Sequence, residues 1–204
     1  MSVAAFIGIA LIHLAAAISP GPSFVVAVRT AAAEGLRPAA GLALGFGLGA
    51  LLWALAALLG LAILFETVPT LLTALKIGGS LVLLFIAWKT WTHAAEPIAV
   101  AENLSVPRST LSAVRLGLVT QFANPKPAVF FGAVFIGLVP PETPVPVLGL
   151  LLFVIFAQET LWYVIVARLF SLDSPRVIYA RSKAVIDRVF GGLIGLLGAK
   201  IALT

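Results

Sequence analysis

The stretch AISPGPSF at residues 17–24 places two prolines in the middle of an apolar segment that extends from about residue 3 to residue 28. A helix needs about 20 apolar residues to cross the hydrocarbon core of a membrane, so the segment is long enough to do so. Pro20 and Pro22 interrupt this helix, because proline lacks a backbone N–H and clashes with the preceding turn. Within lipid such lost hydrogen bonds are hard to replace. The stretch therefore predicts a membrane helix built in two parts.

The composition of the whole chain is typical of a membrane protein. Of its 204 residues, 61% are hydrophobic and 10% are charged, with a mean hydropathy of +1.15; a soluble domain carries roughly 25% charged residues. The chain has no cysteine, which excludes disulfides and thiol-ligated metals, and its two histidines, His13 and His93, are far apart. The sequence predicts no cofactor, no metal site and no catalytic residues. The net charge of +5 comes from residues between the apolar segments, a pattern that reports membrane orientation and not a nucleic-acid partner.

Apolar runs of about 20 residues recur along the chain, and each is long enough for one spanning helix. The sequence therefore predicts an all-α integral membrane protein. Its six transmembrane helices are expected near residues 3–28, 39–64, 71–91, 111–139, 145–169 and 184–203.

Basic residues are distributed unequally between the two ends of these helices. The side that carries loops one to two, three to four and five to six holds most of the 13 lysines and arginines. The opposite side holds only Lys76 and Lys200, and Lys126 falls within the fourth span. Because cytoplasmic loops carry the excess of Lys and Arg, we expect both termini on the non-cytoplasmic side.

The two halves of the chain resemble each other. ISPGPSF in the first span is echoed by FANPKPAVF in the fourth, and the third and sixth spans each open on a Gly-Gly pair. We therefore expect one three-helix repeat at 1–92, a cytoplasmic linker at 93–110 and a second repeat at 111–204, which an odd number of spans forces to run inverted. Interrupted spans at matching positions of inverted repeats indicate a transporter's binding site. Glycines at 41, 45 and 49 are assigned to helix packing.

The residues around the two interruptions favour a polar ligand. Ser19 and Asn124 are good N-caps, and each precedes a proline, which is favoured at the first helical position. Each broken span should consist of two half-helices meeting about 14–15 Å from the cytoplasmic surface, near the membrane centre. The new N-termini would suit an anionic group such as a carboxylate. The prolines also leave four carbonyls without helical donors: those of Ala16, Ile18, Gln121 and Ala123.

Two ionisable residues lie within predicted spans, where charge is costly and functional by default. Lys126 is adjacent to the second interruption, and Glu159 lies near the middle of the fifth span. Lys126 would attract a substrate carboxylate or neutralise Glu159 when the site is empty. Glu159 would receive a substrate ammonium or carry a coupling proton. The alternative is a structural Lys126–Glu159 ion pair that only sets the register of two helices.

Three further polar or aromatic residues are candidates with two interpretations each. Gln121, one turn before the second interruption, would bond either the substrate or a neighbouring helix. Trp162, one turn after Glu159, would line a pocket or simply pack. His13, two turns before the first interruption, is more typical of a bridge between helices than of a proton relay.

With both interruptions and the inverted halves, the chain resembles the LysE/RhtB family of bacterial amino-acid exporters (threonine, homoserine and lysine efflux type) over nearly its full length. The similarity is carried by ISPGPSF, ALKIGGSLVLLFIAWKTW, TQFANPKPAVFF, Glu159 with Trp162 and Tyr163, and FGGLIGLLGA. It implies a proton-driven exporter of amino acids in the bacterial inner membrane, working as a homodimer. It places function on Pro20, Gly21, Pro22, Asn124, Pro125 and Lys126. The acid of the fifth span is often aspartate in the family, and here it is Glu159.

Three other functions were weighed against export of a small zwitterion. Export of a metal cation would need several carboxylate, His or Cys ligands within the membrane. Apart from Glu159, the predicted spans offer mainly His13 and amide side chains. An intramembrane enzyme lacks support, because neither a His-Glu-x-x-His nor a Gly-x-Ser-x-Gly motif is present. A non-transporting scaffold would explain the glycines but not two capped and charged interruptions.

Overall fold

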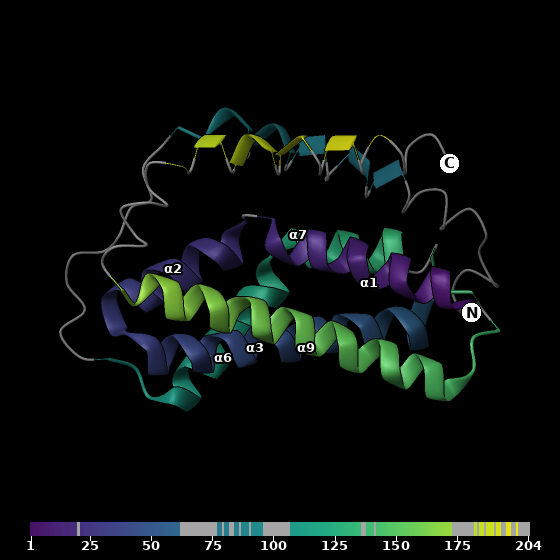
Figure 1. Cartoon of the computed structure of the whole chain (residues 1–204), viewed down its shortest axis with the longest axis horizontal. Coiled ribbons are helices and arrows are strands. Elements are labelled where there is room, and N and C mark those ends of the chain that lie inside the picture. The colour runs from purple at the N-terminus through teal and green to yellow at the C-terminus, as the bar shows by residue number, and fades with distance from the viewer. Residues whose placement is uncertain are drawn as a thin grey trace.

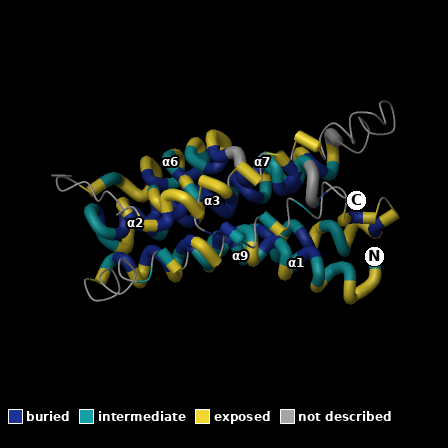
Figure 2. Tube along the Cα trace, turned by 90° about the horizontal axis from the view of Figure 1, so that it is seen from above, coloured by how far each residue is buried: buried dark blue, intermediate teal, exposed yellow. Residues whose placement is uncertain are grey.

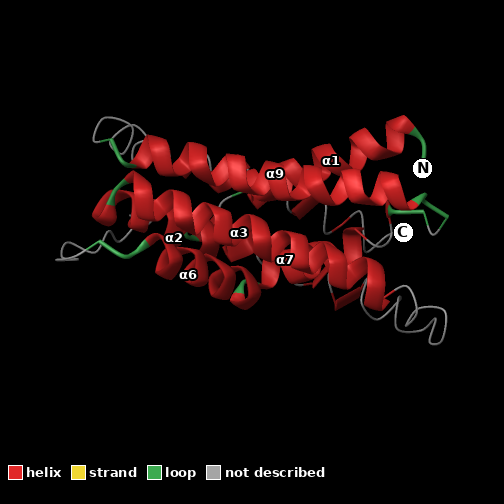
Figure 3. Cartoon of the chain, turned by 90° about the horizontal axis from the view of Figure 1, so that it is seen from below, coloured by secondary structure: helices red, strands yellow, loops and turns green. Residues whose placement is uncertain are grey.

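The structure is a computed structural model, and it describes residues 1–19, 21–61, 107–135, 138–140 and 142–172, together with short pieces between 77 and 95 and between 182 and 199. Every regular element among these residues is helical (Figure 3), so the predicted all-α class is confirmed for this part of the chain. Pro20, much of the predicted spans at 71–91 and 184–203, and most of the predicted linker at 93–110 lie outside the described residues.

The described helices follow the apolar runs and end at the expected interruptions. The first run forms α1 (Val3–Ile18) and α2 (Pro22–Glu34), and the fourth forms α6 (Thr110–Ala123) and α7 (Pro125–Val129). The second run forms α3 (Leu36–Ala56), extended by a π-helical turn, Ala57–Leu61; the fifth forms α9 (Val145–Phe170). A second π-helical turn, Phe130–Phe135, follows α7.

Two described helices are long and apolar enough to cross a membrane, Leu36–Leu59 and Val145–Phe170. The pair Val3–Ile18 and Pro22–Glu34 bends by 57° and makes a third candidate if it counts as one broken span. The chain is therefore a membrane protein with candidate spanning helices. Six spans in two inverted repeats stay a prediction.

Helix α3 lies at the centre of the described bundle, packed against α6 on one side and α9 on another (Figure 1). Its glycines allow this packing. A Cβ on Gly41 would lie 2.9 Å from the carbonyl oxygen of Thr110, and one on Gly45 would overlap the backbone of Val114. Gly117 of α6 meets Gly45 in the same way, whereas Gly47 faces Thr160 of α9. The packing role predicted for the α3 glycines is confirmed, because only residues without a side chain allow backbones this close.

Figure 2 shows buried residues along the facing sides of these helices and exposed residues on the outward faces. Many of the exposed residues are apolar. Leu11 of α1 and Phe153 and Leu161 of α9 are examples of exposed apolar residues. In water such a surface would be unfavourable, but lipid is as apolar as the side chains themselves. The outward faces therefore suit helices surrounded by lipid.

One polar contact ties the end of α2 to the start of α6. Glu34 is buried, its Oε2 accepts a hydrogen bond from the backbone N–H of Arg108 at 2.8 Å, and its Oε1 lies 3.6 Å from the Arg108 guanidinium. The ion pair contributes little, because the Arg108 side chain is partly exposed. The backbone bond matters more, since an N–H left without a partner costs free energy.

Glu34→Ala is therefore expected to destabilise the protein by about 1–3 kcal/mol. That corresponds to a fall of roughly 2–10 °C in the melting temperature measured on detergent-solubilised protein. Glu142→Ala is the matched control, because Glu142 is exposed. Equal melting temperatures for the two variants would contradict a structural role for Glu34.

Candidate functional site

The first interruption lies between Ile18 and Pro22, as predicted, but its capping differs from the prediction. Ser19 is the C-cap of α1, with its N–H donating to the Ala15 carbonyl at 3.1 Å, and Gly21 stands before α2. The prediction that Ser19 caps the second half-helix is therefore wrong. The reason is Pro22: a residue before proline is pushed out of the helical region, and Gly21 is fully extended. With no capping side chain at Gly21, the half-helix starts at Pro22.

The second interruption has the predicted capping. Asn124 has extended backbone angles, and its side-chain oxygen accepts a hydrogen bond from the Lys126 N–H at 3.0 Å. Pro125 is the first residue of α7. Lys126 also precedes a proline, Pro127, yet it is helical because the Asn124 cap holds its N–H. The two motifs thus start their half-helices at different prolines for a local reason, the presence or absence of a capping side chain.

Lys126 joins the two interruptions. Its ammonium donates to the carbonyl oxygens of Ala16 at 2.8 Å and of Ser19 at 2.6 Å. The side chain is buried and passes Gly21, where a Cβ would lie 3.6 Å from Nζ. The expectation that the first motif frees the Ala16 carbonyl is confirmed, and the lysine of the second motif now occupies it. Of the other predicted carbonyls, that of Gln121 accepts from the Trp53 indole at 3.4 Å.

Glu159 is held by different partners. Gln121 donates from Nε2 to Oε1 of Glu159 at 2.9 Å, and Nε2 of His13 lies 3.7 Å from Oε2. Lys126 and Glu159, both fully described, do not form a direct ion pair within 4.0 Å, which sets aside the simple structural pair considered from the sequence. His13 bonds through Nδ1 to the Gln158 side chain at 2.9 Å, so the predicted bridge between α1 and α9 is confirmed.

A directed chain of hydrogen bonds connects Glu159 to the second interruption. Because Asn124 uses its oxygen for the Lys126 N–H, its amide nitrogen must donate, and it does so to Ser23 Oγ at 2.9 Å. The Ser23 hydroxyl then donates to Oε1 of Gln121 at 2.9 Å, and Gln121 donates to Glu159. This series of hydrogen bonds ends at the Glu159 carboxylate, which accepts the last of them. Ser23 was missed from the sequence as a site residue; its place in the first turn of α2 was the available signal.

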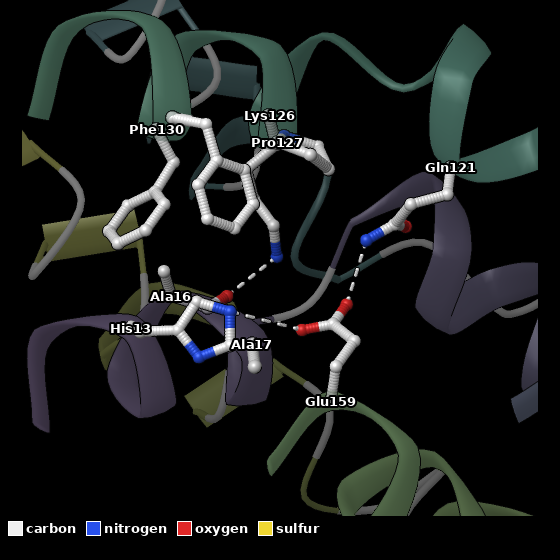
Figure 4. Close-up of a pocket in the computed structure, with 9 residues that line it drawn as sticks. His13, Ala16, Ala17, Gln121, Lys126, Pro127, Phe130 and Glu159 are labelled. Carbon is white, nitrogen blue, oxygen red and sulfur yellow. Dashed lines mark hydrogen bonds and ion pairs between the residues drawn. The ribbon is translucent and has the colours of Figure 1, made fainter. Parts of the chain in front are cut away.

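The polar groups converge on a small cavity between the helices, and their side chains are buried (Figure 4). His13, Gln121, Lys126 and Glu159 point toward one another from α1, α6, α7 and α9, and the remaining wall is apolar and includes Phe130 and Phe131. The cavity has a volume of about 20 Å³, and one water needs about 10–15 Å³ on this measure. The cavity as the structure shows it is therefore too small for a molecule much larger than water.

The other predicted site residues lie around this centre. Ser19 takes part through its carbonyl, and Gly21 through its contact with Lys126. Pro22 is exposed. Trp162 is half-buried against the core cluster that contains Phe46 and is not among the described residues that line the cavity. Pro20 is outside the described residues, and only the backbone of Pro125 is described.

Comparison with known proteins places this arrangement in a family. The chain is 31% identical over 202 residues to a threonine efflux protein of Escherichia coli (strain K12), covering 98% of both chains. It is 30% identical over 203 residues to the threonine efflux protein of Salmonella typhi, again covering 98% of both. A membrane protein of Escherichia coli named YahN is 29% identical over 185 residues, 90% of this chain and 82% of YahN.

No solved structure matches the chain. The family model described as LysE type translocator matches residues 14–204, which include both interruptions. The chain therefore belongs to the LysE type translocator family, whose members are transporters and not enzymes.

Proposed function

We propose that the protein is a secondary active transporter that exports an amino acid, or a related small zwitterion, from the bacterial cytoplasm. The observation that carries the proposal is the meeting of the two broken helices at one lysine, Lys126, in a family that includes threonine efflux proteins. Threonine is the first candidate substrate. We further propose two inverted repeats, at 1–92 and 111–204, a homodimer, and termini on the non-cytoplasmic side of the inner membrane.

The contacts of Lys126 suggest how a zwitterion would bind. Its ammonium donates hydrogen bonds to the carbonyls of Ala16 and Ser19. These carbonyls are also suitable acceptors for the ammonium group of an amino acid. When a substrate takes these carbonyls, Lys126 is released and becomes a partner for the substrate carboxylate. The substrate ammonium would thus replace Lys126 at the carbonyls, and the substrate carboxylate would pair with the released Lys126. Gln121 and Asn124 are close enough to this centre to orient the substrate by hydrogen bonds.

The proposal is tested by efflux from cells preloaded with labelled amino acids, beginning with threonine and extending to a panel. Cells that express the chain should lose a subset of the panel faster than cells with an empty vector. Dissipating the proton gradient should remove the difference. Equal loss across the panel, with the protein present in the membrane, would contradict export of amino acids.

Glu159→Gln is expected to remove the dependence of transport on the proton gradient. The amide oxygen of the new side chain still accepts from Gln121, but the amide cannot take up and release a proton. The measurement is the rate of efflux at several external pH values, compared with Glu142→Gln, whose carboxylate is exposed. Transport by Glu159→Gln that equals the parent at every pH would eliminate a proton-carrying role for Glu159.

A further inference from the structure

The hydrogen bond of His13 to Gln158 determines which nitrogen of the imidazole carries hydrogen. Nδ1 lies 2.9 Å from the amide oxygen Oε1 of Gln158, and an amide oxygen can only accept. Nδ1 is therefore the protonated nitrogen of the neutral ring, and Nε2 presents a lone pair. That lone pair faces Oε2 of Glu159 at 3.7 Å. Without another proton, two acceptors face each other within a buried site.

A single additional proton converts this repulsion into attraction, whichever side receives it. On Nε2 it makes an imidazolium beside a carboxylate, and on Oε2 it makes a carboxylic acid that can donate to the imidazole. Both side chains are buried and line the same cavity, which has room for about one water to exchange a proton with them. The other polar or titratable groups around the pair are Lys126 of α7, Gln121 of α6, and Gln158 and Tyr163 of α9. In this arrangement Lys126 is hydrogen-bonded to the two carbonyls, and the glutamines are neutral amides.

We propose that His13 and Glu159 together hold the coupling proton, and that its release transfers Lys126 from the carbonyls of the first interruption to Glu159. This rests on the proposed function and adds His13 to it. With the proton bound, His13 and Glu159 attract each other, and the Lys126 ammonium is hydrogen-bonded to the carbonyls of Ala16 and Ser19. When the proton leaves to the cavity, Glu159 becomes a carboxylate that keeps the Gln121 hydrogen bond but has no charged partner, so it attracts the ammonium that lines the same cavity.

This movement of Lys126 makes binding of the proton and binding of the substrate mutually exclusive. A Lys126 ammonium drawn to Glu159 leaves the two carbonyls open to the ammonium of a substrate. Reprotonation of the pair returns Lys126 to the carbonyls and expels that ammonium. One proton is thus released for each substrate bound and rebound for each substrate discharged, which is the stoichiometry of an antiporter.

His13→Asn separates the two roles of the imidazole, because it removes Nε2, which faces Glu159, and keeps a group in the place of Nδ1, which bonds Gln158. The asparagine amide reaches as far as Nδ1 of histidine, so it can keep the bond to Gln158 while removing Nε2. His93→Asn is the matched control, because it makes the same substitution at an exposed histidine. A purely structural role for His13 would lower the rate of transport by His13→Asn but leave its dependence on the gradient like that of His93→Asn.

The transport test uses purified protein in lipid vesicles with threonine, or the substrate identified by the efflux panel. For one-to-one exchange a gradient of one pH unit supports about tenfold accumulation. Each variant is compared with itself with and without the gradient, so a lower overall rate does not affect the ratio. The parent and His93→Asn should accumulate substrate with the gradient, whereas His13→Asn should show a ratio near one. A tenfold ratio for His13→Asn would overturn the proposal.

A second measurement tests the proton site without transport. In the His93→Gln background His13 is the only histidine, and ¹⁵N-histidine NMR reports the state of each ring nitrogen. We expect Nδ1 to carry hydrogen throughout and the Nε2 signal to change with pH and with Glu159→Gln. A ring protonated on Nε2 alone, or unaffected by Glu159→Gln, would overturn the proposal. A parent that carries no amino acid while the NMR expectation holds would instead overturn the proposed function and the coupling role, leaving the proton site.

Discussion

Lys126→Met is expected to lower the rate of efflux by at least about 100-fold, the equivalent of about 2.7 kcal/mol. The buried ammonium makes two charge-assisted hydrogen bonds, to the carbonyls of Ala16 and Ser19. Such bonds are worth about 1.5–3 kcal/mol each, and methionine replaces neither. The variant also lacks the cation that would pair with a substrate carboxylate. The measurement is efflux of preloaded amino acids, with the amount of variant in the membrane determined in parallel.

The control for this result is Lys89→Met, which removes a lysine whose side chain is exposed. It changes the net charge and the length of the side chain by the same amount, so general effects of losing a lysine are matched. Lys89→Met should export at the parent's rate. If Lys126→Met is folded, present in the membrane and as active as Lys89→Met, the site proposed around the two interruptions is wrong.

Gly45→Ala is expected to destabilise the protein more than any other single methyl group added to a described glycine of α3. Its Cβ would overlap the carbonyl of Val114 and would also lie 2.9 Å from the Cα of Gly117. These are backbone atoms, which cannot rotate away as a side chain can. Overpacking of this kind costs about 1–3 kcal/mol or more, and a melting temperature in detergent should fall by roughly 2–10 °C or more.

Gly149→Ala in α9 is the matched control, since a Cβ there would meet nothing within 4 Å. Alanine is the better helix former by about 1 kcal/mol, so this variant should melt at or slightly above the parent's temperature. The difference between the two variants measures the contact between α3 and α6, because the added group is the same. Similar melting temperatures would show that the helices separate without cost and that the glycines are not required for packing.

Local features of the chain determined where the helices break and what they face. Proline removes its own N–H, and Asn124 caps a helix two residues away, so both interruptions could be predicted from a few neighbouring residues. The high mean hydropathy predicted a membrane protein. The spacing of Gly41, Gly45 and Gly49 likewise predicted one close-packed face on α3. The error at Ser19 was also local, since Gly21, placed before Pro22, is pushed out of the helical region.

Only the tertiary structure decided which partners meet at the site. Lys126 binds carbonyls 107 and 110 residues away in sequence, and His13 contacts Gln158 across a separation of 145 residues. Nothing local specifies such contacts, because they depend on how α1 and α7 are rotated against α9. From the sequence, a direct Lys126–Glu159 pair was one of the alternatives, whereas in the structure Lys126 contacts the Ala16 and Ser19 carbonyls and Glu159 contacts Gln121 and His13. A buried charge binds the groups that surrounding helices bring within reach, and the packing of α3 against α6 and α9 selects those groups.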